Sequence, residues 1–506
     1  MDFYETIFDL GLSYMLDPIS YDKPKFKNEE HMLKLLTKCI QENAKTLIYG
    51  DYDLDGLMSL LITRDTMRYL GHTNHTTFRY MYRTHDLDKM AVAQAISGRY
   101  KYMIICDTAS SDLVSLKRLI NAGVTPIVID HHISKYAYED YPDKMCIINS
   151  MTENRECGTN LKTSAGALTF MLMDSLIKYL NIAPCESLSA YALVSLYSDC
   201  MDMSNQYNRG IYYRAKKLYR HELPEYIGYF MNDFVEFNRR FIEFHFSPKV
   251  NAIFRSENFH LINNFFLTSN LTMNDINARL NEIDVLHKTS RSMVSTAADI
   301  IEYKLLDNFV LGNLSSVDSE INVEDHKLYN YTGLVANILA GRYGKTAVVY
   351  CHSKAGGLKA SLRDQQSRAY LPVFQQFCKA GGHNSAFGIQ LNYFDFSNFI
   401  DCIERIDRNF ALETIPNEPI IIKHERIEPD RRLMIDMAVY NEFAGNTTPL
   451  AFVQHRILPS ITEYRNQYSF KYKWGDLYIQ SNNRLRLFSE FIAKPTKGKD
   501  IKLMIG

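Results

Sequence analysis

Apolar and polar positions follow a regular order along the first 200 residues, in which short apolar strands alternate with longer amphipathic stretches. The pattern predicts strands at 45–50, 76–82, 101–107, 125–130 and 144–149. It predicts helices at 56–70, 88–97, 112–122, 162–180 and 187–198. Strands that alternate with helices favour an α/β fold with a mostly parallel sheet and helices on both faces. In such folds, ligands bind at the carboxyl ends of the strands.

The pattern changes after about residue 200. Residues 205–310 read as mainly helical without strand alternation, and 272–306 predicts one long helix. A second α/β unit is expected between about 325 and 412. Its elements are strands at 346–350 and 358–363 and a helix over VFQQFCKA, residues 373–380. Further on, YSFKYKW (468–474) alternates with a period of two residues, which indicates a strand.

A chain of 506 residues is too long for a single hydrophobic core, so several domains are expected. The changes in pattern divide it into four parts. These are an N-terminal α/β domain at 1–205, a helical connector at 206–310, a second α/β domain at 311–415 and a β-rich region at 416–506.

Composition excludes several classes of protein. No apolar run approaches the roughly 20 residues that span a bilayer, and the N-terminus lacks a basic region and a cleavage site. The nine cysteines are scattered singly without a CxxC pair, which argues against a zinc ribbon or a disulfide framework. We therefore expect a cytoplasmic protein without membrane contact.

The charge of the chain matters through its distribution. The net charge is only −1, so the whole chain carries no basic signature for nucleic acid. From Ala451 to the end, however, there are ten Lys and Arg residues against four Asp and Glu. A basic end on a neutral chain suggests an anionic partner, although a solvated basic tail is the alternative.

Three predicted strands end in side chains that bind metals. These side chains are Asp51, Asp53 and Asp55 in GDYDLDG, Asp107 at the end of YMIICD, and Asp130, His131 and His132 at the end of PIVID. Crowded acids are unfavourable without a cation among them. Oxygen ligands with one or two imidazoles suit manganese or magnesium better than zinc, and a bridging carboxylate holds a pair of such ions. A calcium-like structural site and a plain acidic turn are the alternatives.

Weaker candidates lie elsewhere. Asp199 follows an apolar helical stretch and is either a further ligand or a helix cap. Gly381, Gly382 and His383 allow close approach to an anion, although a helix C-cap explains them nearly as well. The guanidinium of Arg363 suits a phosphate, with an ion pair to Asp364 as the alternative.

In YSFKYKW, the aromatic side chains share one face of the predicted strand and the lysines share the other. The aromatic residues are Tyr468, Phe470, Tyr472 and Trp474, and the lysines are Lys471 and Lys473. Such rings can stack on unpaired bases while lysines lie near phosphates. The alternative is that the rings pack into their own core.

These motifs together resemble the DHH phosphoesterases, and within them the RecJ single-stranded-DNA exonucleases. GDYDLDG, ICD, VIDHH and YSDCMD are similar to the four motifs of the family. Later segments resemble the RecJ stretch after the DHH domain, the DHH-associated domain with its GGH signature, and the oligonucleotide-binding barrel. They are SPKVNAIFR (247–255), TGLVANILAGRYGKTAVVY (332–350), GGHNSAFG (381–388) and EFAGNTTPLAF (442–452).

The resemblance implies roles for individual residues. The metal ligands would be Asp53, Asp55, Asp107, His131 and Asp199, with His132, Asp130 and Asp51 taking catalytic roles beside them. Substrate would be bound by Arg255, Arg363, Gly381, Gly382 and His383. Lys471, Lys473 and Trp474 are added as substrate-binding candidates from the YSFKYKW pattern alone. Three positions depart from the family: Tyr49 replaces a metal-binding histidine, Asp364 a small hydroxyl residue, and Phe254 a glycine.

The resemblance also implies an activity. We expect a hydrolase with two divalent ions, Mn²⁺ or Mg²⁺, that degrades single-stranded DNA from the 5′ end in DNA repair and recombination, in a bacterium or encoded by a bacteriophage. Its partners would be single-stranded DNA, with RNA or oligonucleotides as alternatives, and single-strand-binding or replication proteins. A phosphodiesterase of short oligoribonucleotides or cyclic dinucleotides is one rival. A non-catalytic RecJ-like protein that binds DNA or replication proteins is another, and a purely structural protein is a third.

Overall fold

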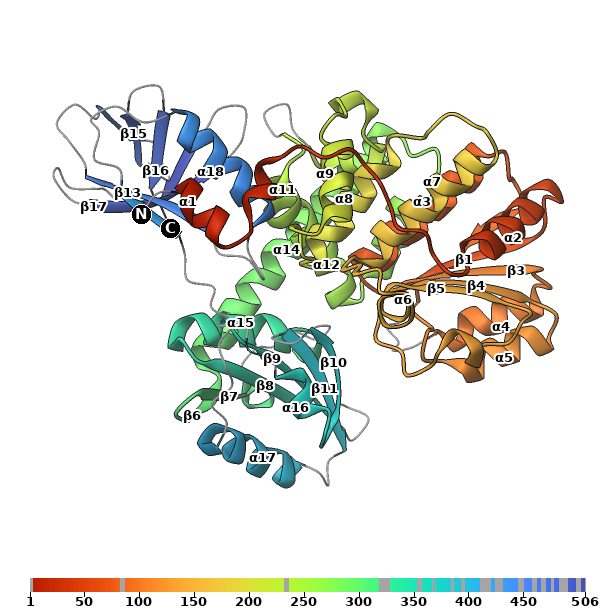
Figure 1. Cartoon of the computed structure of the whole chain (residues 1–506). Coiled ribbons are helices and arrows are strands. Elements are labelled where there is room, and N and C mark those ends of the chain that lie inside the picture. The colour runs from red at the N-terminus through yellow and green to blue at the C-terminus, as the bar shows by residue number, and fades with distance from the viewer. Residues whose placement is uncertain are drawn as a thin grey trace. The chain divides into compact units, whose positions relative to one another are not determined.

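The structure is a computed structural model (Figure 1). It describes residues 3–81, 87–231, 236–317, 328–352, 357–365, 368, 370–383, 386–392, 396–409, 420–423, 431–444, 450–456, 462–465, 470–474, 477–481, 490–496 and 502–505. The chain forms two compact units. The first comprises Met1–Arg79, Arg83–Ser247 and Glu418–Gly506, and the second comprises Tyr80–Tyr82 and Pro248–Asn417.

The first unit contains a five-stranded sheet in which all neighbouring strands are parallel. Its order is β2-β1-β3-β4-β5, and the strands are β1 (Thr46–Gly50), β2 (His75–Thr77), β3 (Tyr102–Cys106), β4 (Thr125–Asp130) and β5 (Cys146–Asn149). The central strands are fully buried because helices cover both faces. The predicted α/β fold class is confirmed.

One predicted strand is much shorter than expected. The prediction for 76–82 reduces to β2, and the described residues 78–81 form no strand. The reason is a competing set of hydrogen bonds. The Tyr80 backbone N–H donates to Asn263 Oδ1 at 2.9 Å, and the Asn263 side-chain amide donates to the Tyr80 carbonyl at 2.7 Å.

The helices of the first unit have the positions expected for crossover connections. They are α1 (Phe3–Asp9), α2 (Glu29–Gln41), α3 (Leu54–Tyr69), α4 (Lys89–Ser97), α5 (Leu113–Asn121), α6 (Ser150–Cys157), α7 (Ala165–Tyr179), α8 (Leu188–Ser198), α9 (Gln206–Ala215), α10 (Glu225–Phe230) and α11 (Arg239–Phe241), with short turns η1 (Ser13–Leu16), η2 (Tyr138–Asp140), η3 (Arg220–Glu222) and η4 (Ile242–Phe246). Helices α3 and α7 pack on one face of the sheet, and α4 and α5 lie on the other (Figure 1). The five predicted helices agree with α3, α4, α5, α7 and α8, whereas α1, α2 and α6 were not predicted.

The C-terminal part of the first unit is β-rich, as predicted. Its seven strands have the order β12-β13-β17-β18-β16-β15-β14. They are β12 (Ile420–Lys423), β13 (Ala451–Arg456), β14 (Thr462–Arg465), β15 (Phe470–Trp474), β16 (Leu477–Ser481), β17 (Glu490–Thr496) and β18 (Lys502–Ile505), and helix α18 (Arg431–Phe443) packs beside β17. The strand predicted in YSFKYKW is confirmed as β15, although residues 468–469 lie outside the described part.

The second unit is built on a mixed six-stranded sheet of order β10-β11-β9-β8-β7-β6. Its strands are β6 (Glu302–Leu305), β7 (Phe309–Asn313), β8 (Thr346–His352), β9 (Gly357–Arg363), β10 (Lys379–His383) and β11 (Ala386–Asn392). Its helices and turns are α12 (Ser247–Ser256), α13 (Phe259–Leu261), η5 (Ile262–Phe266), α14 (Met273–Ile300), η6 (Leu314–Val317), η7 (Leu328–Asn330), α15 (Thr332–Tyr343), α16 (Leu371–Phe374) and α17 (Phe396–Asn409).

Alternate residues of this sheet enter two separate cores. Ala347 and Val349 pack with α14 and α15 on one face, whereas Val348 between them packs with α16 and α17 on the other. This is the period of two that a strand covered on both faces requires. Figure 1 shows α15 and α17 on opposite sides of the sheet.

Two expectations for this unit are wrong. The long helix predicted to reach residue 306 ends at Ile300, and β6 and β7 follow where a mainly helical connector without strands was expected. The helix predicted over VFQQFCKA is also wrong, because α16 spans only Leu371–Phe374. From Lys379 the chain is extended and pairs with β11, since a neighbouring strand satisfies its backbone and outweighs helical propensity.

Candidate metal centre

The predicted ligands gather at the carboxyl edge of the parallel sheet. Strands β1, β3 and β4 are neighbours, so the residues that follow them lie side by side. Asp51 and Asp53 follow β1, Asp107 follows β3, and Asp130 is the last residue of β4. His131 and His132 come directly after Asp130, and Asp199 caps the C-terminal end of α8.

Asp53 and Asp55 have different environments although one residue separates them. Asp53 is the N-cap of α3, and its side chain accepts a hydrogen bond from the backbone N–H of Gly56 at 3.0 Å. Asp55 lies in the first turn of the helix and is 1% exposed. A Cβ at Gly56 would lie 2.4 Å from the Asp51 backbone nitrogen, so this turn needs glycine.

The N-terminus of α7 holds the Asp55 carboxylate. The backbone N–H of Ala165 donates to Asp55 Oδ2 and that of Gly166 to Asp55 Oδ1, both at 2.8 Å. The hydroxyl of Ser195 on α8 also donates to Asp55 Oδ1. Helix N-termini carry partial positive charge, so α7 favours an ionised carboxylate at this position.

His131 lies at the centre of the cluster. Its Nε2 atom is 3.3 Å from Asp107 Oδ1, 3.5 Å from Asp199 Oδ2 and 3.7 Å from Asp55 Oδ2. These three acids come from β3, α8 and α3, so one imidazole reaches carboxylates from three separate elements.

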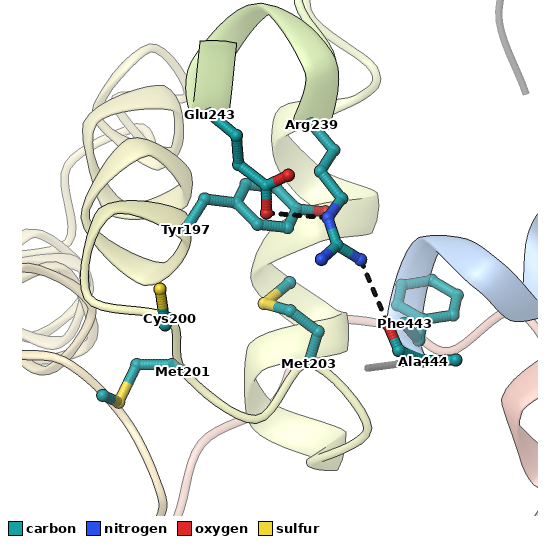
Figure 2. Close-up of a pocket in the computed structure, with 8 residues that line it drawn as sticks. All are labelled: Tyr197, Cys200, Met201, Met203, Arg239, Glu243, Phe443 and Ala444. Atoms are coloured by element: carbon teal, nitrogen blue, oxygen red, sulfur yellow. Dashed lines mark hydrogen bonds and ion pairs between the residues drawn. The ribbon is translucent and has the colours of Figure 1, made fainter. Parts of the chain in front are cut away.

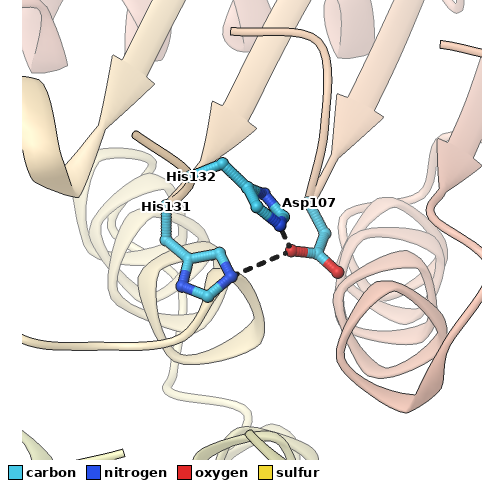
Figure 3. A group of neighbouring side chains, drawn as sticks. All are labelled: Asp107, His131 and His132. Atoms are coloured by element: carbon cyan, nitrogen blue, oxygen red, sulfur yellow. Dashed lines mark ion pairs between the residues drawn. The ribbon is translucent and has the colours of Figure 1, made fainter. Parts of the chain in front are cut away.

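The side chains form three overlapping groups of potential metal ligands, within each of which the ligand atoms lie within 4.8 Å of one another. The groups are Asp107, His131 and His132 (Figure 3); Asp55, His131 and Asp199; and Asp51, Asp53 and Asp107. Since His131 and Asp107 each belong to two groups, the ligands extend over more space than a single triad.

The electrostatics of the cluster fit a divalent cation. Burial raises the pKa of Asp55 to about 6, and the charge of Asp199 contributes in the same direction. Burial also raises the pKa of Asp107 well above its usual value, and the neighbouring carboxylates, Asp55 first, raise it further. Burial likewise raises the pKa of Asp199. Asp107 Oδ1 is buried and accepts no hydrogen bond from the described residues. Each ionised carboxylate here makes ionisation of the others less favourable. A bound divalent cation would offset this repulsion and stabilise the ionised forms.

The backbone at Asp107 is also unusual. Its φ angle is +66°, in the left-handed region that aspartate tolerates better than most residues. Its N–H donates to the Ile129 carbonyl at 2.8 Å, so the chain turns sharply while staying attached to β4. This turn directs the carboxylate toward His131.

Asp130 lies beside the ligand cluster, and its carboxylate binds the neighbouring histidines through hydrogen bonds. It accepts hydrogen bonds from the N–H groups of His131 (2.7 Å) and His132 (3.1 Å), from His132 Nδ1 (2.8 Å) and from the N–H of Ser110 (3.1 Å). Burial favours the neutral carboxyl, but His132 and these donors outweigh it and lower the pKa of Asp130. Asp130 therefore orients His132.

His132 is held yet accessible. Its side chain is 55% exposed. Partial desolvation lowers its pKa, but Asp130 outweighs that effect and raises the pKa of the imidazole to about 10. Because Nδ1 is bound to Asp130, the other ring nitrogen is left to meet a ligand.

Sequence reasoning missed the residues that support the ligands. Besides Ala165, Gly166 and Ser195, the side chain of Asn149 donates to the His132 carbonyl at 2.9 Å and to Ser110 Oγ at 2.8 Å. The only usable signal was Ser164, whose position before an apolar run marks it as the N-cap of α7.

Tyr49, one of the three positions expected to depart from the DHH motifs, lies in the protein core. It is fully buried in β1, and its ring lies 5.5 Å from the ring of Phe78 and 6.3 Å from that of Tyr52. It packs in an aromatic cluster.

The predicted substrate-binding residues of the second unit lie at several places in it. Arg363 ends β9, and its Nη1 donates to the Leu362 carbonyl at 2.7 Å. A Cβ at Gly333 would lie 2.6 Å from Arg363 Nη2, so the guanidinium passes close over α15. Asp364 is buried and pairs with Arg368 at 2.7 Å. We therefore assign its charge to that pair.

The glycine pair lies in a strand. Gly381 and Gly382 belong to β10 at the edge of the sheet, where Gly381 pairs with Gly388 of β11. At Gly382 φ is +138°, and a Cβ there would lie 2.8 Å from the Ala386 carbonyl oxygen. His383 is the last residue of β10, and its side chain lies outside the described part of the structure.

Arg255 lies near the end of α12, and its carbonyl accepts a hydrogen bond from the Asn330 side chain at 2.9 Å. Phe254 beside it is buried and packs 5.7 Å from the Tyr80 ring. In the C-terminal sheet, Lys471, Lys473 and Trp474 lie on β15, but their side chains are outside the described part.

Among the helices that the structure describes, none is long and apolar enough to cross a membrane.

Comparisons with known proteins agree with this fold. Residues 45–194 match the family model described as the DHH family, N-terminal domain. The single-stranded-DNA-specific exonuclease RecJ of Bacillus subtilis is 24% identical over 416 residues, which cover 78% of this chain and 49% of the relative. The chain therefore spans about half the length of that protein.

Solved structures give the same result. The crystal structure of RecJ in complex with Mn²⁺ from Thermus thermophilus has a TM-score of 0.71 at 16% identity, covering 99% of this chain and 74% of that one. The complex of RecJ with Mg²⁺ from the same organism has a TM-score of 0.67 at 14% identity, covering 99% and 73%. Residues 45–194 of this chain are thus similar to the N-terminal domain of the DHH family. The chain as a whole has a RecJ-like fold.

Proposed function

We propose that this protein is a metal-dependent hydrolase that cleaves single-stranded DNA from an end, in the 5′-to-3′ direction. The observation that carries the proposal is the cluster around His131, where buried carboxylates with raised pKa values surround one imidazole. Relatives of this chain bear the name single-stranded-DNA-specific exonuclease.

Divalent ions, with Mn²⁺ preferred and Mg²⁺ as the alternative, would be held by Asp53, Asp55, Asp107, His131 and Asp199, with Asp51 beside them. When bound, two such ions would lower the pKa of a water molecule for in-line attack on phosphorus and offset the charge of the phosphoryl oxygens.

The chain's own residues would prepare the site and the substrate. The α7 N-terminus favours the ionised form of Asp55 against the effect of burial and holds both of its oxygens in place, so this ligand needs no reorganisation during the reaction. Asp130 holds His132 by Nδ1, and the free edge of this ring would donate a hydrogen bond to a phosphate oxygen.

The part of the DNA strand away from the metal centre would be bound by other residues of the chain. Arg255, Arg363, Gly381, Gly382 and His383 would bind phosphates. Lys471, Lys473 and Trp474 would contact further nucleotides through charge and stacking. In this proposal the four parts at 1–205, 206–310, 311–415 and 416–506 serve respectively as catalytic domain, connector, phosphate-binding domain and strand-binding domain. A cytoplasmic role in DNA repair and recombination, with single-strand-binding or replication proteins as partners, would follow.

The direct test uses end-labelled strands with Mn²⁺. The 5′ label and the 3′ label are compared on DNA and on RNA of the same sequence. Early release of the 5′ mononucleotide from DNA supports the proposal. Cleavage restricted to short RNA or cyclic dinucleotides would favour the other phosphodiesterase class, and tight binding without cleavage would indicate a non-catalytic protein.

Variants of the ligands make the test specific to the site. Asp55→Ala and His131→Ala should each abolish cleavage while the circular dichroism spectrum is kept. The matched control is His31→Ala, since His31 is an exposed residue of α2. Retained cleavage in either ligand variant would refute the site.

A further inference from the structure

The last turns of α8 serve two sides of the molecule. Ser195 and Asp199 are four residues apart and lie on one face of the helix. Both face the metal centre, since Ser195 donates to Asp55 and Asp199 lies 3.5 Å from His131. Tyr197 lies between them in sequence and therefore on the opposite face.

Arg239 contacts that opposite face. Tyr197 is 4% exposed, and the guanidinium of Arg239 lies 5.6 Å from the centre of its ring. Arg239 Nε donates to Glu243 Oε1 at 2.8 Å, which fixes the plane of the guanidinium (Figure 2).

Another nitrogen of the Arg239 guanidinium, Nη1, reaches the C-terminal part of the same unit. It donates to the Ala444 carbonyl at 3.1 Å (Figure 2) and to the Asn441 carbonyl at 3.3 Å, both at the end of α18. Carbonyls at a helix C-terminus lack helical partners and favour a cation. Arg239 therefore joins the end of α18 to the end of α8.

The end of α18 is itself fixed to the C-terminal sheet. The Asn441 side chain donates to the carbonyls of Ala451 at 2.8 Å and Pro495 at 3.1 Å, and it accepts from the Ala451 N–H at 2.9 Å. Ala451 begins β13 and Pro495 lies in β17. A continuous set of contacts thus runs from this sheet through Arg239 and Tyr197 to α8.

The end of α8 needs such support. Cys200, directly after Asp199, has a φ angle of +52°, a left-handed conformation that residues other than glycine adopt at a cost. The turn that presents Asp199 is therefore held by its surroundings. A small pocket lies beside this turn, lined by Cys200, Tyr197, Arg239 and Phe443 among others (Figure 2).

We propose that Arg239 is a positioning residue for the metal centre: it holds the end of α18 against Tyr197 and so fixes the end of α8 that carries Asp199. The inference rests on the proposed function. It means that the C-terminal region tunes metal binding in addition to any contact with a nucleic acid strand. Deleting residues after 420 would then weaken the metal centre even for short substrates.

The experiment compares full-length Arg239→Ala with Arg240→Ala, the matched control at the neighbouring exposed arginine. The Mn²⁺ dissociation constant is measured by titration calorimetry. The Mn²⁺ concentration for half-maximal cleavage and the KM for a short DNA strand are measured on the same samples. Arg239→Ala should weaken Mn²⁺ binding about tenfold and raise the half-maximal Mn²⁺ concentration equally, with KM unchanged. Arg240→Ala should match the wild type.

A rescue separates positioning from general stability. Arg239→Lys keeps a cation near the α18 carbonyls and should recover part of the Mn²⁺ affinity. If Arg239→Ala does not fold, Tyr197→Leu carries the test, because it keeps the hydrogen bonds of Arg239 to α18 and removes the ring. Wild-type Mn²⁺ affinity in a folded Arg239→Ala or Tyr197→Leu variant would overturn the inference. A wild-type protein that binds Mn²⁺ but cleaves no nucleic acid would contradict the proposed function alone.

Discussion

The hydroxyl of Ser195 donates a hydrogen bond to Asp55 across 140 positions of sequence. Together with the N–H groups of Ala165 and Gly166, it fixes both oxygens of this carboxylate before any cation arrives. Supporting residues of this kind orient metal ligands and are worth about 10- to 100-fold in metal affinity or activity when removed.

Gly166 gives the sharpest test of that arrangement. A Cβ added there would lie 2.5 Å from Ser195 Oγ and 3.0 Å from Asp55 Oδ1, so Gly166→Ala must displace one of them. We expect about a tenfold or greater loss of Mn²⁺ affinity and of cleavage rate, measured by calorimetry and by kinetics. The control is Gly228→Ala, where a Cβ meets nothing within 4 Å. A Gly166→Ala variant with wild-type Mn²⁺ affinity would contradict the assignment of this support.

Replacing Asp107 should separate stability from activity. Asp107→Asn removes one charge from a buried group of carboxylates, so the metal-free protein should become more stable by roughly 1–2 kcal/mol. Cleavage should be lost because a ligand is gone. Thermal unfolding in a chelator measures the first effect. Asp143→Asn, at an exposed acid, is the control and should leave both properties unchanged. A less stable Asp107→Asn variant would argue against charge repulsion at this site.

The effect of Mn²⁺ on stability should depend on pH. The pKa of Asp55 is about 6 in the folded protein, above the roughly 3.9 of an unfolded chain. Between these values the folded state binds more protons, so the stability of the metal-free protein falls as pH rises through this window. Mn²⁺ must displace a proton from Asp55 at about pH 5 but meets this carboxylate in its ionised form at about pH 7.5. We therefore expect a larger rise in Tm with Mn²⁺ at the higher pH, and an equal rise at both pH values would count against it.

Strand β15 should affect long substrates selectively. Lys473→Ala combined with Trp474→Ala removes a charge and a stacking surface, so binding of long single strands should weaken by about tenfold or more. Dinucleotide cleavage should change little. Fluorescence anisotropy and kinetics measure the two effects. Lys144→Ala is the control. Lys144 is exposed and directly precedes β5, so it lies at the end of the parallel sheet opposite to the metal centre. Equal losses on both substrates would remove β15 from the strand-binding site.

Much of the site was predictable because local sequence and one rule of topology suffice for it. An apolar strand ending in acids predicts where Asp51, Asp53 and Asp107 lie, and neighbouring parallel strands bring their ends together. The hydrogen bonds that hold Asp55 were not predictable. Their donors, the Ala165 N–H and the Ser195 hydroxyl, are more than 100 residues away in sequence, and neither residue type by itself indicates a metal site. Only the packing of α3, α7 and α8 brings them into contact.

The wrong expectations share a cause. VFQQFCKA has helical spacing of apolar residues, yet β11 offers hydrogen-bond partners that turn its end into a strand. The strand expected beyond Thr77 fails because Asn263 takes both backbone groups of Tyr80. In each case a hydrogen-bond partner outside the segment determines the local structure. The secondary-structure propensity of the segment carries no information about that partner.

The first unit is assembled from three stretches of chain. Its early stretches are therefore synthesised well before the last stretch, which completes its fold. The ring of Phe3 packs 5.6 Å from that of Tyr440, a residue translated 437 positions later. At about 5–20 residues per second, the nascent N-terminal helix waits tens of seconds for its partner to leave the ribosome. Premature termination anywhere before α18 would release a polypeptide with that apolar side chain uncovered, a substrate for chaperones and proteases.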